Sequence, residues 1–151
     1  MLGVAGAIHS LRGTVFWSET DAAQIAHFST FFKICEWAEE DFFRRALGDE
    51  AFHGVLESNV MFPRVRAECT YHYPLHVHDD FRVDIVDVSI GVKSISYAFK
   101  VWNETHSTLS AECRLVTVAV DPRGFKSVEV PGYIRERLLA AGARHGEGGR
   151  R

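Results

Sequence analysis

The sequence is poor in cysteine, and the spacing of its few cysteines does not suggest disulfide bonds. Its 151 residues contain three, Cys35, Cys69 and Cys113, an odd number spread far apart. That spacing indicates neither a disulfide framework nor a paired-cysteine metal clip. We therefore predict a protein of the reducing cytoplasm.

The sequence also lacks an excess of positive charge and a long apolar run. Seventeen basic residues against twenty acidic ones give a net charge of −3, which excludes a general nucleic-acid binder. The apolar start, residues 1–10, is too short for a membrane span and has no basic residue before its apolar part, so we expect neither a signal peptide nor a membrane partner.

Phenylalanine is abundant, and it gathers near the start of the chain. Eight of the eleven phenylalanines precede residue 63, at positions 16, 28, 31, 32, 42, 43, 52 and 62. With 46% apolar residues, the length suits one domain with a single core. We expect that domain to span residues 1–141, followed by a disordered glycine- and arginine-rich tail at 142–151.

One long helix is predicted at residues 27–47. Apolar residues recur there at three- and four-residue steps, at positions 28, 31, 35, 38 and 42. Further apolar residues at 32, 34, 37 and 43 widen this stripe, so the helix should be mostly buried. Gly48 is a natural helix end.

Strand patterns of period two fill the chain after Pro63. They cover four segments near 65–73, 81–90, 94–101 and 109–120, with phase slips at Val86 and Val116 that indicate bulges. A first strand at 7–16 and a short helix at 133–141 complete the pattern. Short connections favour antiparallel neighbours. The predicted fold is therefore α+β: a curved antiparallel five-stranded sheet wrapped around one long central helix.

Three segments resemble a known enzyme family. The first is Glu19-Thr20-Asp21-Ala22-Ala23-Gln24-Ile25-Ala26-His27-Phe28-Ser29-Thr30-Phe31-Phe32, followed by Glu36. It is similar to the opening signature of hot-dog-fold acyl-CoA thioesterases, in the 4-hydroxybenzoyl-CoA thioesterase-like branch. Tyr73-Pro74-Leu75-His76-Val77-His78-Asp79-Asp80 resembles the strand-to-strand turn of that branch, which is usually apolar-x-Gly-Asp. Asp121-Pro122-Arg123-Gly124 resembles the turn that closes its last long strand.

The resemblance implies a hot-dog fold and a thioesterase. It implies hydrolysis of a small acyl-CoA or aryl-CoA to the free acid and coenzyme A, with no cofactor beyond the coenzyme A of the substrate. In this family the active site lies between two subunits, so we expect a homodimer that assembles into a homotetramer. A non-catalytic acyl-CoA-binding protein and an enoyl-CoA hydratase of the same fold are the alternatives.

The same resemblance makes Asp21 the catalytic carboxylate, which either attacks the thioester or activates water. Aspartate also favours loops and helix starts, so a purely structural role is the alternative. The unpaired N–H groups at the start of the helix, at His27 and Phe28, would stabilise the oxyanion. His27 could orient the substrate or hold Asp21, or could simply cap the helix.

Six further residues are candidates for substrate binding. Gln24 stands where the branch usually has glycine, Phe31 would shape an acyl pocket, and Glu36 could form a pocket wall. Phosphates of coenzyme A could meet Lys93, Arg123 and Lys126 near strand ends. For each of these charged residues, ordinary exposure to solvent is the alternative.

A crowded group of histidines and aspartates suggests a metal site as a rival hypothesis. His72, His76, His78, Asp79 and Asp80 lie within nine residues, and cupins use a His-x-His pair as metal ligands. Cupins add a glutamate shortly after the pair, which is missing here, and a long central helix does not fit their fold. We therefore expect surface histidines and no metal.

Overall fold

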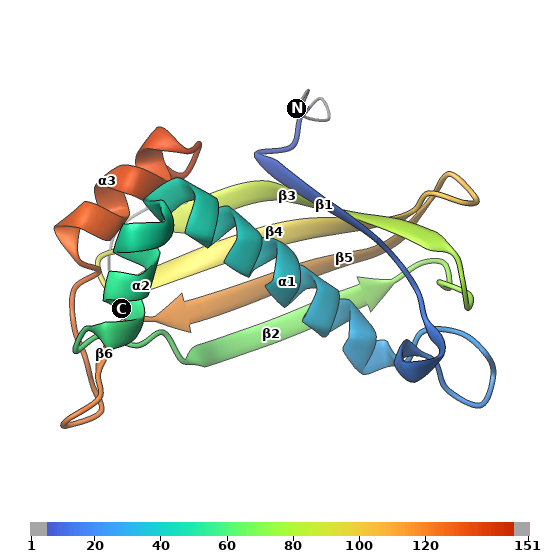
Figure 1. The fold of residues 1–151 in the computed structure, drawn as a ribbon, viewed down its shortest axis with the longest axis horizontal. Coiled ribbons are helices and arrows are strands. Elements are labelled where there is room, and N and C mark those ends of the chain that lie inside the picture. Colours follow the sequence, from blue (N-terminus) through green and yellow to red (C-terminus); the bar gives the residue numbers. More distant parts are fainter. Residues whose placement is uncertain (1–5, 147–151) are drawn as a thin grey trace.

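The computed structural model describes residues 6–146 and shows helix α1 (Phe28–Leu47) lying across one face of a curved sheet (Figure 1). The long strands are β1 (His9–Thr14), β2 (Arg64–Tyr71), β3 (Asp80–Ile90), β4 (Ser94–Asn103) and β5 (Thr108–Val118). They pair antiparallel in the order β1-β3-β4-β5-β2. The predicted α+β hot-dog architecture is confirmed.

Helix α1 buries most of the predicted stripe, but Phe28 (63% exposed) and Trp37 (42% exposed) face outward, so the helix is less buried than predicted. Phe31, Ile34, Cys35, Ala38 and Phe42 are at most 3% exposed, and they belong to one core with the inward-facing residues of the sheet. The helix ends at Gly48, whose φ of 82° is a conformation that glycine adopts without steric cost. The bulk that the phenylalanines supply is thus mainly core.

Smaller elements extend the predicted set. A 3-10 turn, η1 (Trp17–Glu19), precedes α1, while α2 (Asp49–Glu57) follows it directly and was not predicted. Strands β6 (Val120–Asp121) and β7 (Lys126–Ser127) form a two-stranded hairpin. The predicted short helix near the end is confirmed as α3 (Gly132–Ala140). No helix within residues 6–146 is long and apolar enough to cross a membrane.

The two predicted bulges have different outcomes. The pairing of β3 with β4 shifts register between Ile85 and Asp87, which confirms the slip at Val86. The slip expected at Val116 is absent from β5, because Leu115 and Thr117 both stay buried. The pairing of β5 with β4 instead skips Ser110, and β2 shifts register opposite Val116, between Arg64 and Arg66.

A disulfide joins Cys69 to Cys113, contrary to the expectation from spacing. The two residues face each other across β2 and β5 with a Cα–Cα distance of 4.1 Å. Cysteines far apart in sequence meet here only because the strands pair in that register, which spacing along the chain cannot reveal. Cys35 is free and buried. The cysteine pattern therefore no longer supports a reducing compartment.

The end of the chain is ordered further than predicted. The tail was expected to begin at residue 142, but β8 (Arg144–His145) pairs in parallel with β3 and extends the sheet. The rest of the predicted tail, residues 147–151, lies outside the described residues.

Candidate active site

Asp21 opens a tight hairpin loop just before α1. Its N–H donates to the carbonyl of Ile25 at 3.0 Å, and the N–H of Gln24 donates to the carbonyl of Asp21 at 2.9 Å. Gln24 closes the turn with a φ of 61°. A three-residue hairpin loop of this kind calls for a left-handed residue at that position, usually glycine. The backbone thus explains why glycine is usual there in the branch that the sequence resembles.

One of the two carboxylate oxygens of Asp21 is hydrogen-bonded within its own turn. One oxygen, Oδ1, accepts a hydrogen bond from the N–H of Ala23 at 2.8 Å, an ordinary role for aspartate in a turn. The side chain is exposed, and Oδ2 has no protein donor among the described residues. The turn therefore fixes the carboxylate while leaving one oxygen able to meet a substrate or a water molecule.

The loop that carries Asp21 is docked against the segment before β3. The N–H of Ala26 donates to the carbonyl of Leu75 at 2.7 Å, and the N–H of Val77 donates to the carbonyl of Gln24 at 3.0 Å. On the other side, the Thr30 hydroxyl donates to the carbonyl of Glu19 at 2.9 Å. Backbone bonds on both sides hold the loop in one position.

His27 caps the start of α1. Its Nδ1 accepts a hydrogen bond from the N–H of Ser29 at 3.2 Å, and the Ser29 hydroxyl lies 2.7 Å from the same nitrogen. No bond joins His27 to Asp21 within the described part of the chain, so the suggestion that His27 holds Asp21 is not met. The N–H of Phe28 has no acceptor in residues 6–146, which leaves it free to face an oxyanion.

Phe28 and Phe31, at the start of α1, differ sharply in exposure. Phe31 was expected to shape an acyl pocket, but it is 3% exposed and packs in the core. Its ring meets Tyr71 edge-on at 5.0 Å, and the Tyr71 hydroxyl donates to the carbonyl of Phe28 at 2.9 Å. Tyr71 of β2 therefore contacts the start of the helix. Phe28 is 63% exposed and is the aromatic surface beside the loop.

An apolar cavity lies toward the other end of α1, away from Asp21 of the same chain. It has a volume of about 500 Å³ and opens between α1, α2, the segment 58–62 and strands β2, β4 and β5. Apolar side chains dominate its wall: Phe43, Phe52, Val55, Leu56, Val60, Met61, Phe62, Ile95 and Tyr97. Glu36 also lines it, as expected of a wall residue, together with Glu39, Glu40 and Arg64.

Glu39 and Arg64 form an ion pair in this cavity that the sequence did not signal. A carboxylate oxygen of Glu39 lies 2.7 Å from Nη2 of Arg64, and Glu36 lies 3.7 Å from the same nitrogen. Burial raises the pKa of Glu39 above its usual value, and the hydrogen bond and charge of Arg64 oppose that rise without cancelling it. The pair forms between a helix and a strand, so no local pattern marks it.

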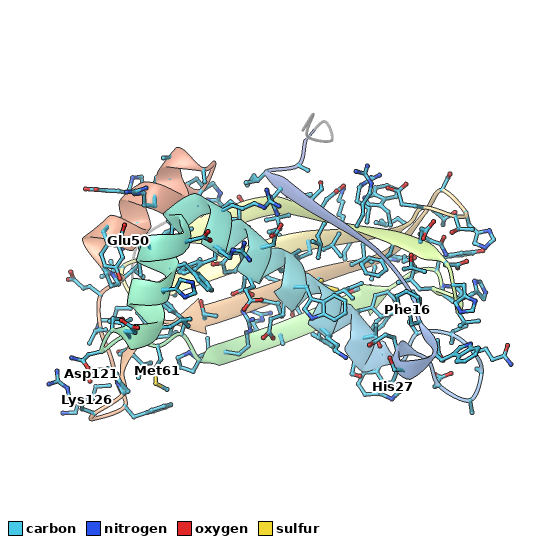
Figure 2. The ribbon with its side chains drawn as sticks, in the orientation of Figure 1. Phe16, His27, Glu50, Met61, Asp121 and Lys126 are labelled. Atoms are coloured by element: carbon cyan, nitrogen blue, oxygen red, sulfur yellow. A yellow bond between two sulfur atoms is a disulfide. The ribbon has the colours of Figure 1, made fainter. Side chains whose placement is uncertain are left out.

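The basic residues expected to meet coenzyme A lie at the far end of the sheet. Lys93 is in the β3–β4 turn, while Arg123 and Lys126 belong to the β6–β7 hairpin. Figure 2 shows Lys126 at the end opposite His27. Arg123 is already paired with Asp121 of its own turn at 3.3 Å. Within one chain, these residues do not approach Asp21.

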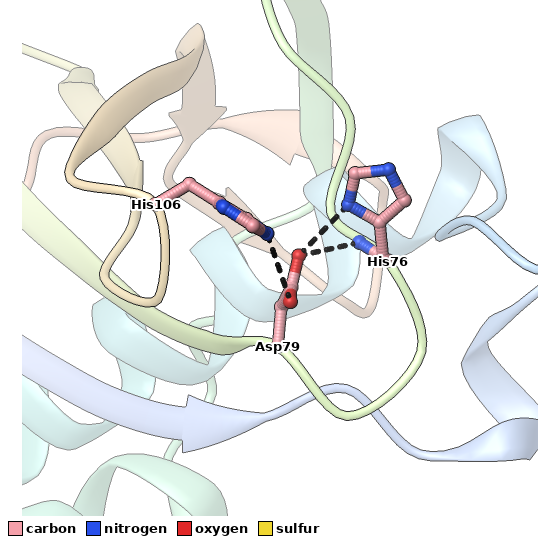
Figure 3. Close-up of side chains that lie close together, drawn as sticks. All are labelled: His76, Asp79 and His106. Atoms are coloured by element: carbon pink, nitrogen blue, oxygen red, sulfur yellow. Dashed lines mark hydrogen bonds and ion pairs between the residues drawn. The ribbon is translucent and has the colours of Figure 1, made fainter.

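The crowded histidines separate in the structure. His72 pairs with Glu112 at 3.0 Å, and the ring of His78 lies 6.0 Å from that of Trp17, outside the cluster. His76 stays beside Asp79, and His106 from the β4–β5 turn joins them (Figure 3). Burial alone would raise the pKa of Asp79, but hydrogen bonds from His76 and Asn103 hold it below its usual value.

Comparisons with known proteins agree with this architecture. The sequence profile of the thioesterase-like superfamily matches residues 15–138. A 1,4-dihydroxy-2-naphthoyl-CoA hydrolase of Crocosphaera subtropica is 25% identical over 111 residues, which are 73% of this chain and 80% of that protein.

Two solved structures show the same fold at lower sequence identity. A 1,4-dihydroxy-2-naphthoyl-CoA thioesterase from Synechocystis superposes with a TM-score of 0.78 at 16% identity, covering 87% of this chain and 95% of its own. A gentisyl-coenzyme A thioesterase superposes with a TM-score of 0.73 at 18% identity, and the alignment covers 85% of this chain and 98% of that protein.

Proposed function

Because the chain belongs to the thioesterase-like superfamily and is a hot-dog thioesterase acting on CoA thioesters, we propose that it cleaves a small acyl-CoA or, preferentially, an aryl-CoA, with Asp21 as its catalytic carboxylate. The observation that carries the proposal is the turn that presents Asp21 before α1. One oxygen of its carboxylate is held by Ala23, and the other is open.

The chemistry follows from a carboxylate next to a helix start. Asp21 either removes a proton from an attacking water or attacks the thioester carbon itself, forming an anhydride that water then opens. In both routes the C–S bond breaks, coenzyme A leaves as a thiolate that takes up a proton, and the acid is released. The free N–H of Phe28 would stabilise the oxyanion of the tetrahedral intermediate.

The proposal includes a homodimer formed through the edge strand β2. The short Cα distance between Cys69 and Cys113 is typical of an antiparallel pair that is not hydrogen-bonded. By alternation, the N–H and C=O groups of Ala67, Cys69 and Tyr71 point away from β5, toward the open edge. Val65 on the same strand is 60% exposed. A second copy could add its β2 to this edge, and pairing of two such dimers would give the expected tetramer.

Such a dimer would unite the two separated parts of the site. Antiparallel pairing reverses the strand, so the Tyr71 end of one β2 would face the Arg64 end of the other. Asp21 lies at the first end and the cavity at the second. The carboxylate of one subunit would then serve the cavity of its partner, and Lys93, Arg123 and Lys126 of the partner could meet the phosphates of coenzyme A.

The cavity favours an aromatic acyl group. Its volume of about 500 Å³ suits a small ligand, and Phe43, Phe52, Phe62 and Tyr97 supply ring surfaces. The Glu39 carboxylate could accept a hydrogen bond from a hydroxyl on the ring. The relatives named for dihydroxynaphthoyl-CoA and gentisyl-CoA act on hydroxylated aryl thioesters of this kind.

The test is a thiol-release screen over hydroxylated aryl-CoAs, unsubstituted benzoyl-CoA and straight-chain acyl-CoAs. We expect release from the aryl thioesters with the highest kcat/KM for a hydroxylated ring. A preference for straight chains would overturn the aryl assignment. Hydration of crotonyl-CoA without thiol release would identify a hydratase, and binding without any turnover would identify an acyl-CoA-binding protein; either result would overturn the proposal.

A further inference from the structure

Three side chains from two separate turns converge at the end of the sheet (Figure 3). His76 and Asp79 come from the segment between β2 and β3, and His106 comes from the β4–β5 turn. Nδ1 of His76 lies 3.0 Å from Oδ2 of Asp79, and Nε2 of His106 lies 3.6 Å from Oδ1. One potential ligand atom from each residue lies within 4.8 Å of the other two.

Asp79 is a buried carboxylate with no permanently charged partner. It is 6% exposed, and its ion pairs within residues 6–146 are with His76 and His106 alone. Asp84, which is equally buried, instead has Arg82 at 2.9 Å. Buried carboxylates are normally paired with a cation or coordinate a metal ion, and the neighbours of Asp79 are two imidazoles, which are common metal ligands.

The carboxylate and one of the histidines are held in place by the same buried residue. Asn103 is fully buried, and its Nδ2 donates to Oδ2 of Asp79 at 2.7 Å. Its Oδ1 accepts the backbone N–H of His106 at 2.9 Å. Metal ligands are usually held in place by hydrogen bonds from surrounding residues, and Asn103 could do this for Asp79 and His106. The side chains of His76 and His106 are 45% and 46% exposed, which leaves their outer side open to solvent.

We propose that His76, Asp79 and His106 bind one divalent transition-metal ion, with Zn²⁺ as the first candidate. Metal bonds of about 2.0–2.2 Å in tetrahedral geometry separate neighbouring ligand atoms by about 3.4 Å, close to the two distances found here. Two imidazoles with one carboxylate suit Zn²⁺, Co²⁺, Ni²⁺ or Fe²⁺ better than Mg²⁺ or Ca²⁺, which prefer oxygen ligands. Water would complete the coordination from the open side.

The ion would link the β2–β3 connection to the β4–β5 turn, next to the proposed catalytic loop. Ile25 of that loop forms a β-bridge with His76. The bound ion would therefore fix the segment on which the Asp21 loop rests. The site does not depend on the proposed thioesterase chemistry, because none of its ligands belongs to that machinery.

The test uses the full chain without an affinity tag, stripped of metal with a chelator. Titration with Zn²⁺ is followed by calorimetry and thermal unfolding, and titration with Co²⁺ is followed by visible absorption. We expect one ion per chain, a rise in Tm with Zn²⁺, and a Co²⁺ spectrum typical of nitrogen and oxygen ligands.

The decisive variants are His106→Gln and His76→Gln, compared with His72→Gln as a matched control. His72 is also an exposed histidine beside a carboxylate, but it lies outside the cluster. We expect His106→Gln and His76→Gln to weaken Zn²⁺ binding by about 100-fold or more and His72→Gln to leave it unchanged. Less than one ion per chain in the parent protein, or equal binding in all three variants, would overturn the proposal.

Discussion

At the residue scale, the turn from Asp21 to Gln24 combines a catalytic candidate with a strained backbone. A side chain at a φ of 61° costs about 1–2 kcal/mol relative to an ordinary conformation. This conformational strain at Gln24 lies in the same loop that presents the Asp21 carboxylate. Strain of this kind gathers at functional sites because the surrounding structure holds it in place.

Replacing Gln24 by glycine should therefore stabilise the protein. Relief of the left-handed strain is partly offset by the larger conformational entropy of glycine in the unfolded chain, about 0.4–1 kcal/mol. We expect Gln24→Gly to raise the free energy of unfolding by up to about 1 kcal/mol, measured by urea denaturation.

Gln24→Ala is the matched control, because it removes the side chain and keeps the strain. No stabilisation is expected for it. If the Gln24 side chain lines the acyl pocket, both variants will change KM or the preference among acyl groups. Unchanged kinetics in both would place Gln24 outside the pocket, and equal stability of the two variants would contradict the strain argument.

Glu39 should make stability depend on pH in a direction opposite to most carboxylates. Burial raises its pKa in the folded state above the unfolded value of about 4.3. The stability it contributes is full below that unfolded value and is lost as pH rises through the folded pKa. Glu39→Gln removes this loss, so the stability of the variant relative to the parent should increase with pH above about 4.3.

Urea denaturation at a series of pH values measures this difference, with Glu57→Gln as the control. Glu57 is an exposed glutamate at the end of α2 and does not contribute to the pKa shift of Glu39. Its variant should follow the parent at every pH. A Glu39→Gln curve that also runs parallel to the parent would contradict the raised pKa.

Residues that act through local structure were predictable, and those that act through tertiary contacts were not. Asp21, His27 and Phe28 stand in one short segment, so the sequence indicates the turn and the start of the helix together. Glu39 meets Arg64, and His106 meets Asp79, only after strands and helices have packed. The burial of Phe31 was not predictable, because a helical stripe does not show which of its members the core covers.

At the element scale, β2 is an edge strand of the sheet, and the proposed dimer pairs it with a second copy. If it pairs with a second copy, the outward N–H of Ala67 is one of the bonds that hold the dimer. Ala67→Pro removes that N–H without breaking a bond to β5, because proline is tolerated on an edge where the N–H faces outward. We expect a folded monomer by sedimentation, with thiol release reduced at least about tenfold.

The variant Ala67→Ser keeps the N–H and should remain a dimer with normal activity. An Ala67→Pro protein that stays dimeric with an unchanged circular dichroism spectrum would place the interface elsewhere.

The long elements were predictable because each carries several repeats of its own period. Helix α1 and strands β2 to β5 appear in the sequence as patterns of 3.6 and 2 residues. Helix α2 was missed since its nine residues include Gly54 and form little more than two turns. The Cys69–Cys113 disulfide and the bulge on β2 depend on strand register, which no single segment records.

At the scale of the whole molecule, each active site of the proposed dimer uses residues of two subunits. A mixing experiment tests this arrangement. Asp21→Asn removes the carboxylate, and Leu56→Trp places bulk in the cavity wall, where Leu56 is 68% exposed. Each homodimer alone should be inactive. Subunit exchange would rebuild one complete site per heterodimer, so about a quarter of the parent activity should return. A mixture that stays inactive after proven exchange would mean that carboxylate and cavity act within one chain.

The most direct test of the central claim is thiol release from an aryl-CoA by Asp21→Asn, measured beside the parent protein and Asp49→Asn. Asp49 is a matched control, because it is an exposed aspartate at the start of α2. We expect kcat/KM to fall at least about 100-fold for Asp21→Asn, with unchanged circular dichroism and oligomeric state, and to stay at the parent value for Asp49→Asn. Parent-level turnover by Asp21→Asn would contradict the assignment of Asp21 as the catalytic carboxylate.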